Sequence, residues 1–219
     1  MKKNLLLAMF AVFFLTAVSY ADNFTLLSPG YENGSNVSVV LPVNDSADTF
    51  AAYSKMNFSG VDYMGYCVDY ASVDWNTLYN DYKMLSLPNE DRYKEAAWLF
   101  ETYGTNPATS GKNVQLAIWE IIFDQGDPNH SVYPSDGLFY VTSAGSAILA
   151  TVQGYVNEAL THSDFDASSY QLLVSPLEGP FYGEVNQDFI IKTPEPGMLA
   201  LLGIGLLGLV LVTRRKDRS

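Results

Sequence analysis

Residues 113–124 read NVQLAIWEIIFD. Apolar side chains occupy nearly every side of a helix built on this stretch, so the helix is predicted to lie buried inside a folded domain. Asn113 can cap its first turn, and the helix is expected to run to about Asp124. Gln115 is the exception, because a buried amide that lacks hydrogen-bond partners costs about 1 to 3 kcal/mol. Either a partner meets this amide inside the protein, or Gln115 lies at the rim with its amide in water.

Two further helices are predicted, one on each side of this helix in the chain. Residues 90–103 place apolar side chains on one face, carry acidic residues in the first turn and are followed by Gly104. Residues 143–160 repeat apolar side chains at helical spacing, with Gly154 as a weak point. The region from Trp75 to His162 is therefore expected to be helical.

Strands are predicted before and after the helical region, because β-branched and aromatic residues alternate there with small polar ones. They cover residues 24–27, 36–43, 50–58 and 61–70 before the helices, and residues 170–177 and 187–194 after them. The order strands, helices, strands predicts an α+β fold. We expect a β-sandwich or barrel formed by the N- and C-terminal strands, with an inserted helical subdomain.

The first 21 residues have the features of a cleavable secretion signal. Lys2 and Lys3 precede an almost entirely apolar run over residues 5–18. The next three residues, Ser19-Tyr20-Ala21, are suitable for a signal peptidase, which would leave Asp22 as the mature N-terminus. An uncleaved anchor helix is the alternative, but the apolar run is short for a membrane span.

The C-terminal end, residues 193–219, combines three features in a fixed order. A Pro-Glu-Pro motif comes first, then an apolar run predicted to cross a membrane as a helix over residues 197–213, then a basic cluster. The basic cluster would stay in the cytoplasm, so the body of the protein would lie outside the membrane. The motif is Pro194, Glu195 and Pro196, and the cluster is Arg214, Arg215, Lys216 and Arg218.

This three-part order resembles the PEP-CTERM sorting signal of Gram-negative bacteria that make an extracellular polymeric matrix. The resemblance implies an exported protein at the cell surface, attached to the membrane through its C-terminal helix or released after processing. The processing enzyme would be an exosortase that acts near the Pro-Glu-Pro motif. A permanent single-span anchor is the alternative.

The body between the two ends, residues 22–192, is strongly acidic. Six basic residues stand against 23 acidic ones between Asp22 and Pro196. This charge excludes nucleic acid as a partner and favours a basic partner surface. Two histidines and one cysteine are too few for a usual zinc site, and the acidic loop 124–129 is better explained as a turn than as a calcium site. No metal and no cofactor is predicted.

The single cysteine, Cys67, lies in GYCVDY at residues 65–70. A disulfide within one chain is therefore excluded, which leaves an inert core thiol, a disulfide between two copies, or a reactive group. A cysteine hydrolase would need a histidine and an orienting acid beside the thiol. Neither His130 nor His162 lies in a recognisable context for that role.

Three segments carry a second resemblance: Tyr66-Cys67-Val68-Asp69, AAWLFETY at residues 96–103, and VQLAIW at residues 114–119. Together they are similar to the thioester domain of surface adhesins from Gram-positive bacteria, although Val114 stands where that family usually has threonine. The resemblance implies that the side chains of Cys67 and Gln115 condense into an internal thioester. The residues around the bond would be Tyr66, Asp69, Ala117, Ile118 and Trp119.

A thioester of this kind implies a surface adhesion or binding protein that captures a partner amine covalently. The partner would be an amine-bearing protein or a component of a polysaccharide matrix. The bond is consumed in one event, so the protein would not be an enzyme. The alternative is a non-covalent structural component of the cell surface or extracellular matrix that has no thioester.

Overall fold

The structure is a computed structural model of the 219-residue chain. It describes residues 23–28, 34–41, 46–69, 71, 74, 76–80, 82–104, 107–124, 130–134, 137–175 and 186–193. The predicted signal peptide, the Pro-Glu-Pro motif, the predicted membrane span and the basic cluster lie outside these residues. Among the helices of the described part, none is long and apolar enough to cross a membrane.

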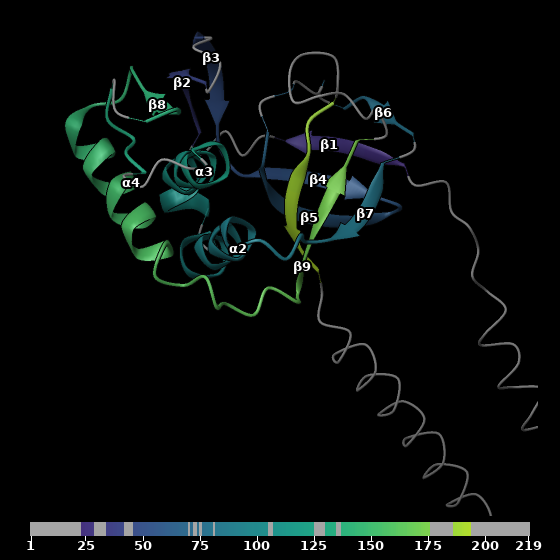
Figure 1. The fold of residues 1–219 in the computed structure, drawn as a ribbon. Coiled ribbons are helices and arrows are strands. Elements are labelled where there is room, and N and C mark those ends of the chain that lie inside the picture. Colours follow the sequence, from purple (N-terminus) through teal and green to yellow (C-terminus); the bar gives the residue numbers. More distant parts are fainter. Residues whose placement is uncertain are drawn as a thin grey trace, which may run out of the picture.

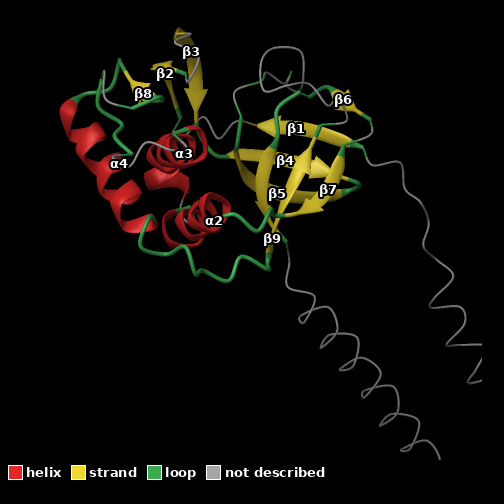
Figure 2. Ribbon diagram, in the orientation of Figure 1, coloured by secondary structure: helices red, strands yellow, loops and turns green. Residues whose placement is uncertain are grey.

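The larger sheet has seven antiparallel strands in the order β6-β1-β4-β5-β10-β9-β7. It curls strongly into a half-barrel (Figures 1 and 2). Strands from both ends of the body meet in it, because β10 pairs with β5 on one side and β9 on the other. The strands are β1 (Phe24–Ser28), β4 (Ser54–Phe58), β5 (Val61–Cys67), β6 (Leu78–Tyr79), β7 (Lys83–Ser86), β9 (Tyr170–Val174) and β10 (Phe189–Lys192).

A second sheet has three strands in the order β3-β2-β8 and lies beside the helices (Figure 2). Its strands are β2 (Ser35–Val40), β3 (Ser46–Ala51) and β8 (Tyr140–Val141). The predicted strand over residues 50–58 is wrong as a single element. The chain leaves β3 at Ala51 and enters β4 of the other sheet at Ser54, so an apparently continuous strand pattern serves two sheets.

Three helices lie in the chain between β7 and β9: α2 (Asp91–Tyr103), α3 (Pro107–Phe123) and α4 (Ser146–Ala159). All three were expected, but α3 begins six residues before the predicted cap, so Asn113 lies inside the helix and not at its start. The expectation of a helical region from Trp75 to His162 is also too broad, because β6, β7 and β8 fall within it.

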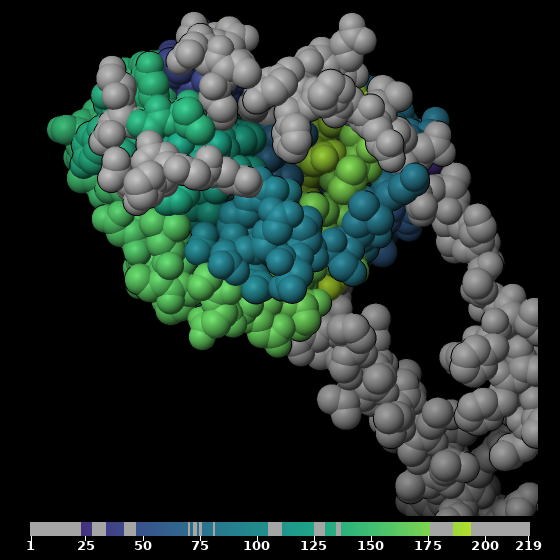
Figure 3. All heavy atoms as spheres, viewed as in Figure 1, coloured from purple at the N-terminus to yellow at the C-terminus, as the bar shows by residue number. Residues whose placement is uncertain are grey.

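The helices gather on one side of the curled sheet (Figure 1). On the face seen in Figure 3, α2 lies between α4 and β7. Helix α3 supplies much of the shared core, as its apolar composition predicts, because Leu116, Ile118, Trp119 and Ile121 are almost completely buried. The predicted α+β class is confirmed. The sandwich-or-barrel architecture and the inserted helical subdomain stay predictions.

Candidate functional site

Cys67 is the last residue of β5 and extends past β4, one of the two strands that pair with β5. On one side β10 continues, with Phe189 opposite Cys67 and the Val68 N–H donating to the Asp188 carbonyl at 3.1 Å. On the other side the ladder with β4 begins only at Ser54, opposite Gly65. Backbone groups of successive residues point to alternate sides of a strand. The N–H and C=O of Cys67 therefore face the side that β4 leaves open.

The side-chain amide of Gln115 occupies this open position. The Cys67 N–H donates to Oε1 of Gln115 at 2.9 Å, and Nε2 of Gln115 donates to the Cys67 carbonyl at 2.8 Å. The side chain takes the place that a backbone peptide of a longer β4 would have filled. Gln115 is 0% exposed, so the buried amide with an internal partner is confirmed and a position at the rim is wrong.

A second contact fixes how α3 sits against the end of β5. The indole Nε1–H of Trp119 donates to the Asp69 carbonyl at 3.0 Å. Gln115 and Trp119 are four residues apart, which places them on one helix face about 6 Å apart along the axis. Two side chains one helix turn apart therefore bond to the backbone of Cys67 and of Asp69, where the chain bends after β5.

Three more residues that were predicted to surround the pair, Ala117, Ile118 and Tyr66, are all 0% exposed. The Tyr66 ring meets Phe100 of α2 edge-on, with ring centroids 5.0 Å apart. A Cβ on Gly104, directly after α2, would lie 2.9 Å from the Tyr66 ring, so glycine there lets the end of α2 approach β5. The site is enclosed by apolar surfaces of three elements.

The Cys67 thiol is held in its protonated form. Burial raises its pKa well above the ordinary value, and the negative charge of Asp69 acts in the same direction. A hydrogen bond with the Ser54 side chain lowers the pKa by less. Cys67 is a free cysteine and is 7% exposed. A disulfide between two copies is disfavoured, because it would need the sulfur at the surface.

Two half-buried carboxyl groups, those of Asp69 and Asp188, lie close to each other after the end of β5. The Asp188 N–H donates to Oδ2 of Asp69 at 2.9 Å, and Oδ1 of Asp188 accepts from the Ser175 N–H at 2.7 Å. Burial, and then the charge of Asp188, raise the pKa of Asp69 well above its usual range. Burial also raises the pKa of Asp188 to about 6. Both carboxyl groups therefore hold a proton more tightly than an ordinary aspartic acid does.

The histidine side chains lie in other parts of the structure. The His162 ring stacks on Trp98 with centroids 4.2 Å apart, and His130 lines a hollow together with Ile121 and Leu160. No interaction within the described ranges joins either histidine to Cys67. This arrangement disfavours a cysteine hydrolase. The same ranges contain no group of three or more His, Cys, Asp or Glu residues that could hold a metal ion.

Ser54, Asp188 and Tyr82 were missed by sequence reasoning. The Tyr82 hydroxyl donates to the Gln187 carbonyl at 2.9 Å, and burial, followed by the charges of Asp188 and Asp69, raises its pKa. Ser54 reaches Cys67 through the pairing of β4 with β5, and Asp188 through the pairing of β10 with β5. The predicted strands over residues 50–58 and 187–194 contain these two residues, but a strand pattern does not reveal the pairing partner.

Residues 192–216 match the family model of the PEP-CTERM protein-sorting motif. The motif indicates an exported protein sorted to the cell surface in Gram-negative bacteria, and it implies processing by an exosortase. The matched residues include the predicted Pro-Glu-Pro motif and three residues of the basic cluster, so the predicted sorting signal is confirmed. Comparisons with curated proteins and with solved structures found no match. The thioester-domain resemblance of the body therefore stays a prediction.

Proposed function

We propose that this surface-sorted protein is an adhesion or binding protein that captures a partner amine covalently, through a thioester between Cys67 and Gln115. The observation that carries the proposal is the reciprocal pair of hydrogen bonds between the Gln115 amide and the Cys67 backbone. These bonds hold the amide against the residue that bears the thiol, across 48 positions of sequence.

Thioester formation joins two side chains of the same molecule and releases ammonia. Sγ of Cys67 bonds to Cδ of Gln115, the bond from Cδ to Nε2 breaks, and ammonia leaves with the former thiol proton. The hydrogen bonds bring the Gln115 amide to the residue that bears the thiol, so the reaction would be intramolecular. The Cys67 N–H already donates to Oε1, the atom on which negative charge develops in the tetrahedral intermediate. The carboxyl pair of Asp69 and Asp188 can relay the proton.

Capture of a partner amine breaks the thioester at the same carbon, Cδ of Gln115. A partner amine bonds to Cδ, the bond from Cδ to Sγ breaks, and the thiol returns to Cys67. The apolar enclosure keeps water from the thioester beforehand. The acidic body attracts protonated amines, on a protein or on a component of a polysaccharide matrix. Because each molecule reacts once, the protein is not an enzyme, and the reaction needs no cofactor.

The proposal includes the way in which the body is presented. Residues 22–192 form one extracellular unit, a barrel-like body with the helices as an inserted subdomain, after removal of residues 1–21. The chain leaves this unit at Thr193, directly after β10 and before the Pro-Glu-Pro motif. The helix over residues 197–213 then holds it in the membrane until an exosortase acts.

The raised pKa of the thiol favours a second candidate function. A buried cysteine that stays protonated is also what a structural module with an inert core thiol would have. In that case the protein is a non-covalent component of the cell surface or extracellular matrix. Gln115 then serves only to satisfy the backbone groups at the end of β5 that β4 leaves unpaired.

Intact-mass measurement separates the two candidates. We would compare the exported protein with its Cys67→Ala and Gln115→Ala variants, each with and without methylamine. The thioester predicts a wild type lighter than its sequence by one ammonia and a methylamine adduct that both variants lack. Gln171→Ala, a glutamine change outside the site, should behave as wild type. A wild type of full sequence mass with a free thiol would exclude the thioester and leave the structural module.

A further inference from the structure

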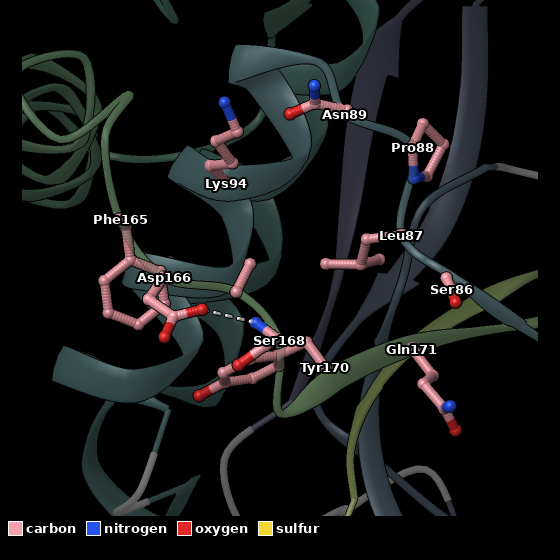
Figure 4. Close-up of a pocket in the computed structure, with 11 residues that line it drawn as sticks. Ser86, Leu87, Pro88, Asn89, Lys94, Phe165, Asp166, Ser168, Tyr170 and Gln171 are labelled. Atoms are coloured by element: carbon pink, nitrogen blue, oxygen red, sulfur yellow. Dashed lines mark hydrogen bonds between the residues drawn. The ribbon is translucent and has the colours of Figure 1, made fainter.

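A second feature, separate from Cys67 and Gln115, is a groove where the curled sheet meets the helices (Figure 4). One wall is the segment that leads from β7 into α2, residues 86–89, together with Lys94. The other wall is the segment that leads from α4 into β9, residues 165–168, together with Tyr170 and Gln171. Its volume is about 400 Å³, within the range of sites that bind small ligands.

Both walls are fixed by backbone contacts. Ser86 and Gln171 face each other in the ladder between β7 and β9. Across the turn before β9, the Ser168 N–H donates to Oδ1 of Asp166 at 3.0 Å, and the Tyr170 N–H donates to the Ala167 carbonyl at 2.9 Å. A groove with walls held in this way is already formed before a ligand arrives, so little ordering cost opposes binding.

The lining combines apolar surface with uncharged hydrogen-bonding groups. Figure 4 shows the Leu87 side chain pointing between the walls, and Phe165 lies on the opposite wall. The Asn89 amide and the Ser168 hydroxyl, one on each wall, each offer a donor and an acceptor, whereas Figure 4 shows the Gln171 amide pointing away from Leu87 and Phe165. A purely apolar ligand would leave these groups unpaired, at a cost. The lining suits a ligand with many hydroxyls and an apolar face.

Charge and backbone chemistry further restrict the class of ligand that the groove can bind. The groove has one cation, Lys94, and one anion, Asp166, and Lys94 already lies 3.5 Å from Asp91. The strongly acidic body repels polyanions. An extended peptide would need a backbone ladder along the wall, but Pro88 has no N–H and interrupts it just beyond the end of β7.

We propose that this groove binds a neutral oligosaccharide. The C–H faces of the sugar rings would lie on Leu87, Pro88 and Phe165, and the hydroxyls would bond to Asn89 and Ser168. This site goes beyond the covalent capture proposed above and does not depend on it, because none of the thioester residues lines the groove. It would give the protein reversible attachment to a glycan.

Affinity electrophoresis of the exported protein tests the proposal. Native gels would contain dextran, pullulan, a mixed-linkage β-glucan or galactomannan, with alginate as the polyanion and gelatin as the peptide probe. We expect at least one neutral glycan to retard the protein with a Kd below about 1 mM, and Asn89→Ala with Ser168→Ala to weaken retardation at least about tenfold. Asn89→Ala alone, at an exposed position, should act in the same direction without disturbing the fold.

The matched control is Asn36→Ala, an exposed amide on β2 of the other sheet, which should leave retardation unchanged. Methylamine treatment, which would consume a thioester, should also leave it unchanged. The proposal is overturned if no neutral glycan retards the protein, if alginate or gelatin retards it more strongly, or if Asn36→Ala weakens retardation as much as Asn89→Ala. Loss of retardation after methylamine would place glycan attachment at Cys67 and overturn the groove as well.

Discussion

The site at Cys67 and the groove between β7 and α2 use the same kind of side chain in opposite ways. Gln115 is fully buried, and both ends of its amide bond to the backbone of one residue. Asn89 lines an open groove, where its amide can meet a ligand. The first amide completes the protein's own structure, whereas the second remains available for other molecules.

The contrast between the two amide sites indicates where each kind of chemistry can occur. Enclosure in the core suits a bond that must form once and be protected from water. An open groove with fixed walls suits reversible contact. Variants that make the same chemical change in both regions can therefore test whether the contrast is real.

The largest contrast is expected between Gln115→Ala and Gln171→Ala, both in a Cys67→Ala background so that no thioester contributes. Loss of the Gln115 amide leaves the N–H and C=O at position 67 buried without partners, so the free energy of unfolding should fall by about 2 to 5 kcal/mol. Gln171→Ala should change it by about 0.5 kcal/mol or less. Urea denaturation measures both. Equal losses of unfolding free energy would mean that the Gln115 amide does not stabilise the end of β5.

A smaller effect is expected for Trp119→Phe, which removes the indole donor to the Asp69 carbonyl but keeps an aromatic ring. We expect a loss of about 1 to 3 kcal/mol, because a buried carbonyl loses its partner. Trp98→Phe is the matched control, since Trp98 is also buried and contributes a ring stack on His162. If urea denaturation finds Trp98→Phe the more damaging change, the two-point contact of α3 with β5 does not set the helix register.

The smallest expected effect is a change of stability with pH, and this change has opposite signs for Asp188 near Cys67 and for Asp166 in the groove. Burial raises the pKa of Asp188 to about 6 in the folded protein. The folded state therefore holds this proton more tightly than the unfolded chain, and stability should fall as pH rises from about 4 to about 6, then level off. A hydrogen bond from the Ser168 side chain lowers the pKa of Asp166 in the groove, so that acid contributes stability that is lost as pH falls.

Thermal unfolding at a series of pH values checks this prediction. Asp188→Asn should flatten part of the decline between about pH 4 and 6, while Asp69, whose pKa is raised as well, keeps the rest. Asp166→Asn should leave that decline unchanged, because its side chain is exposed. A full decline in the Asp188→Asn variant would show that another group carries it.

Sequence patterns were sufficient for the elements whose burial is one-sided or complete. The buried helix over residues 113–124 and the amphipathic helix over residues 90–103 both exist. The start of α3 was placed too late because Asn113 looked like a cap. Pro107, at the first position of the actual helix, is the signal that was overlooked, since proline favours that position.

Strand pairing could not be predicted, because alternation reports which residues lie on one face and not which strand lies alongside. The division of residues 50–58 between two sheets leaves no break in the pattern. The contact of Gln115 with Cys67 was implied by resemblance alone. Its physical cause, a β4 too short to cover the end of β5, becomes visible only in the assembled sheet.

The central position of β10 has a mechanical consequence. This strand is the last element before the sorting signal, and it lies between β5 and β9, with Phe189 opposite Cys67. Tension between a surface anchor and a captured partner would run along β10 and load its hydrogen bonds on both sides in shear, many at once. A terminal strand at a sheet edge would instead peel away one bond at a time. The attachment point of the chain is thus placed where the body can resist being pulled from the cell.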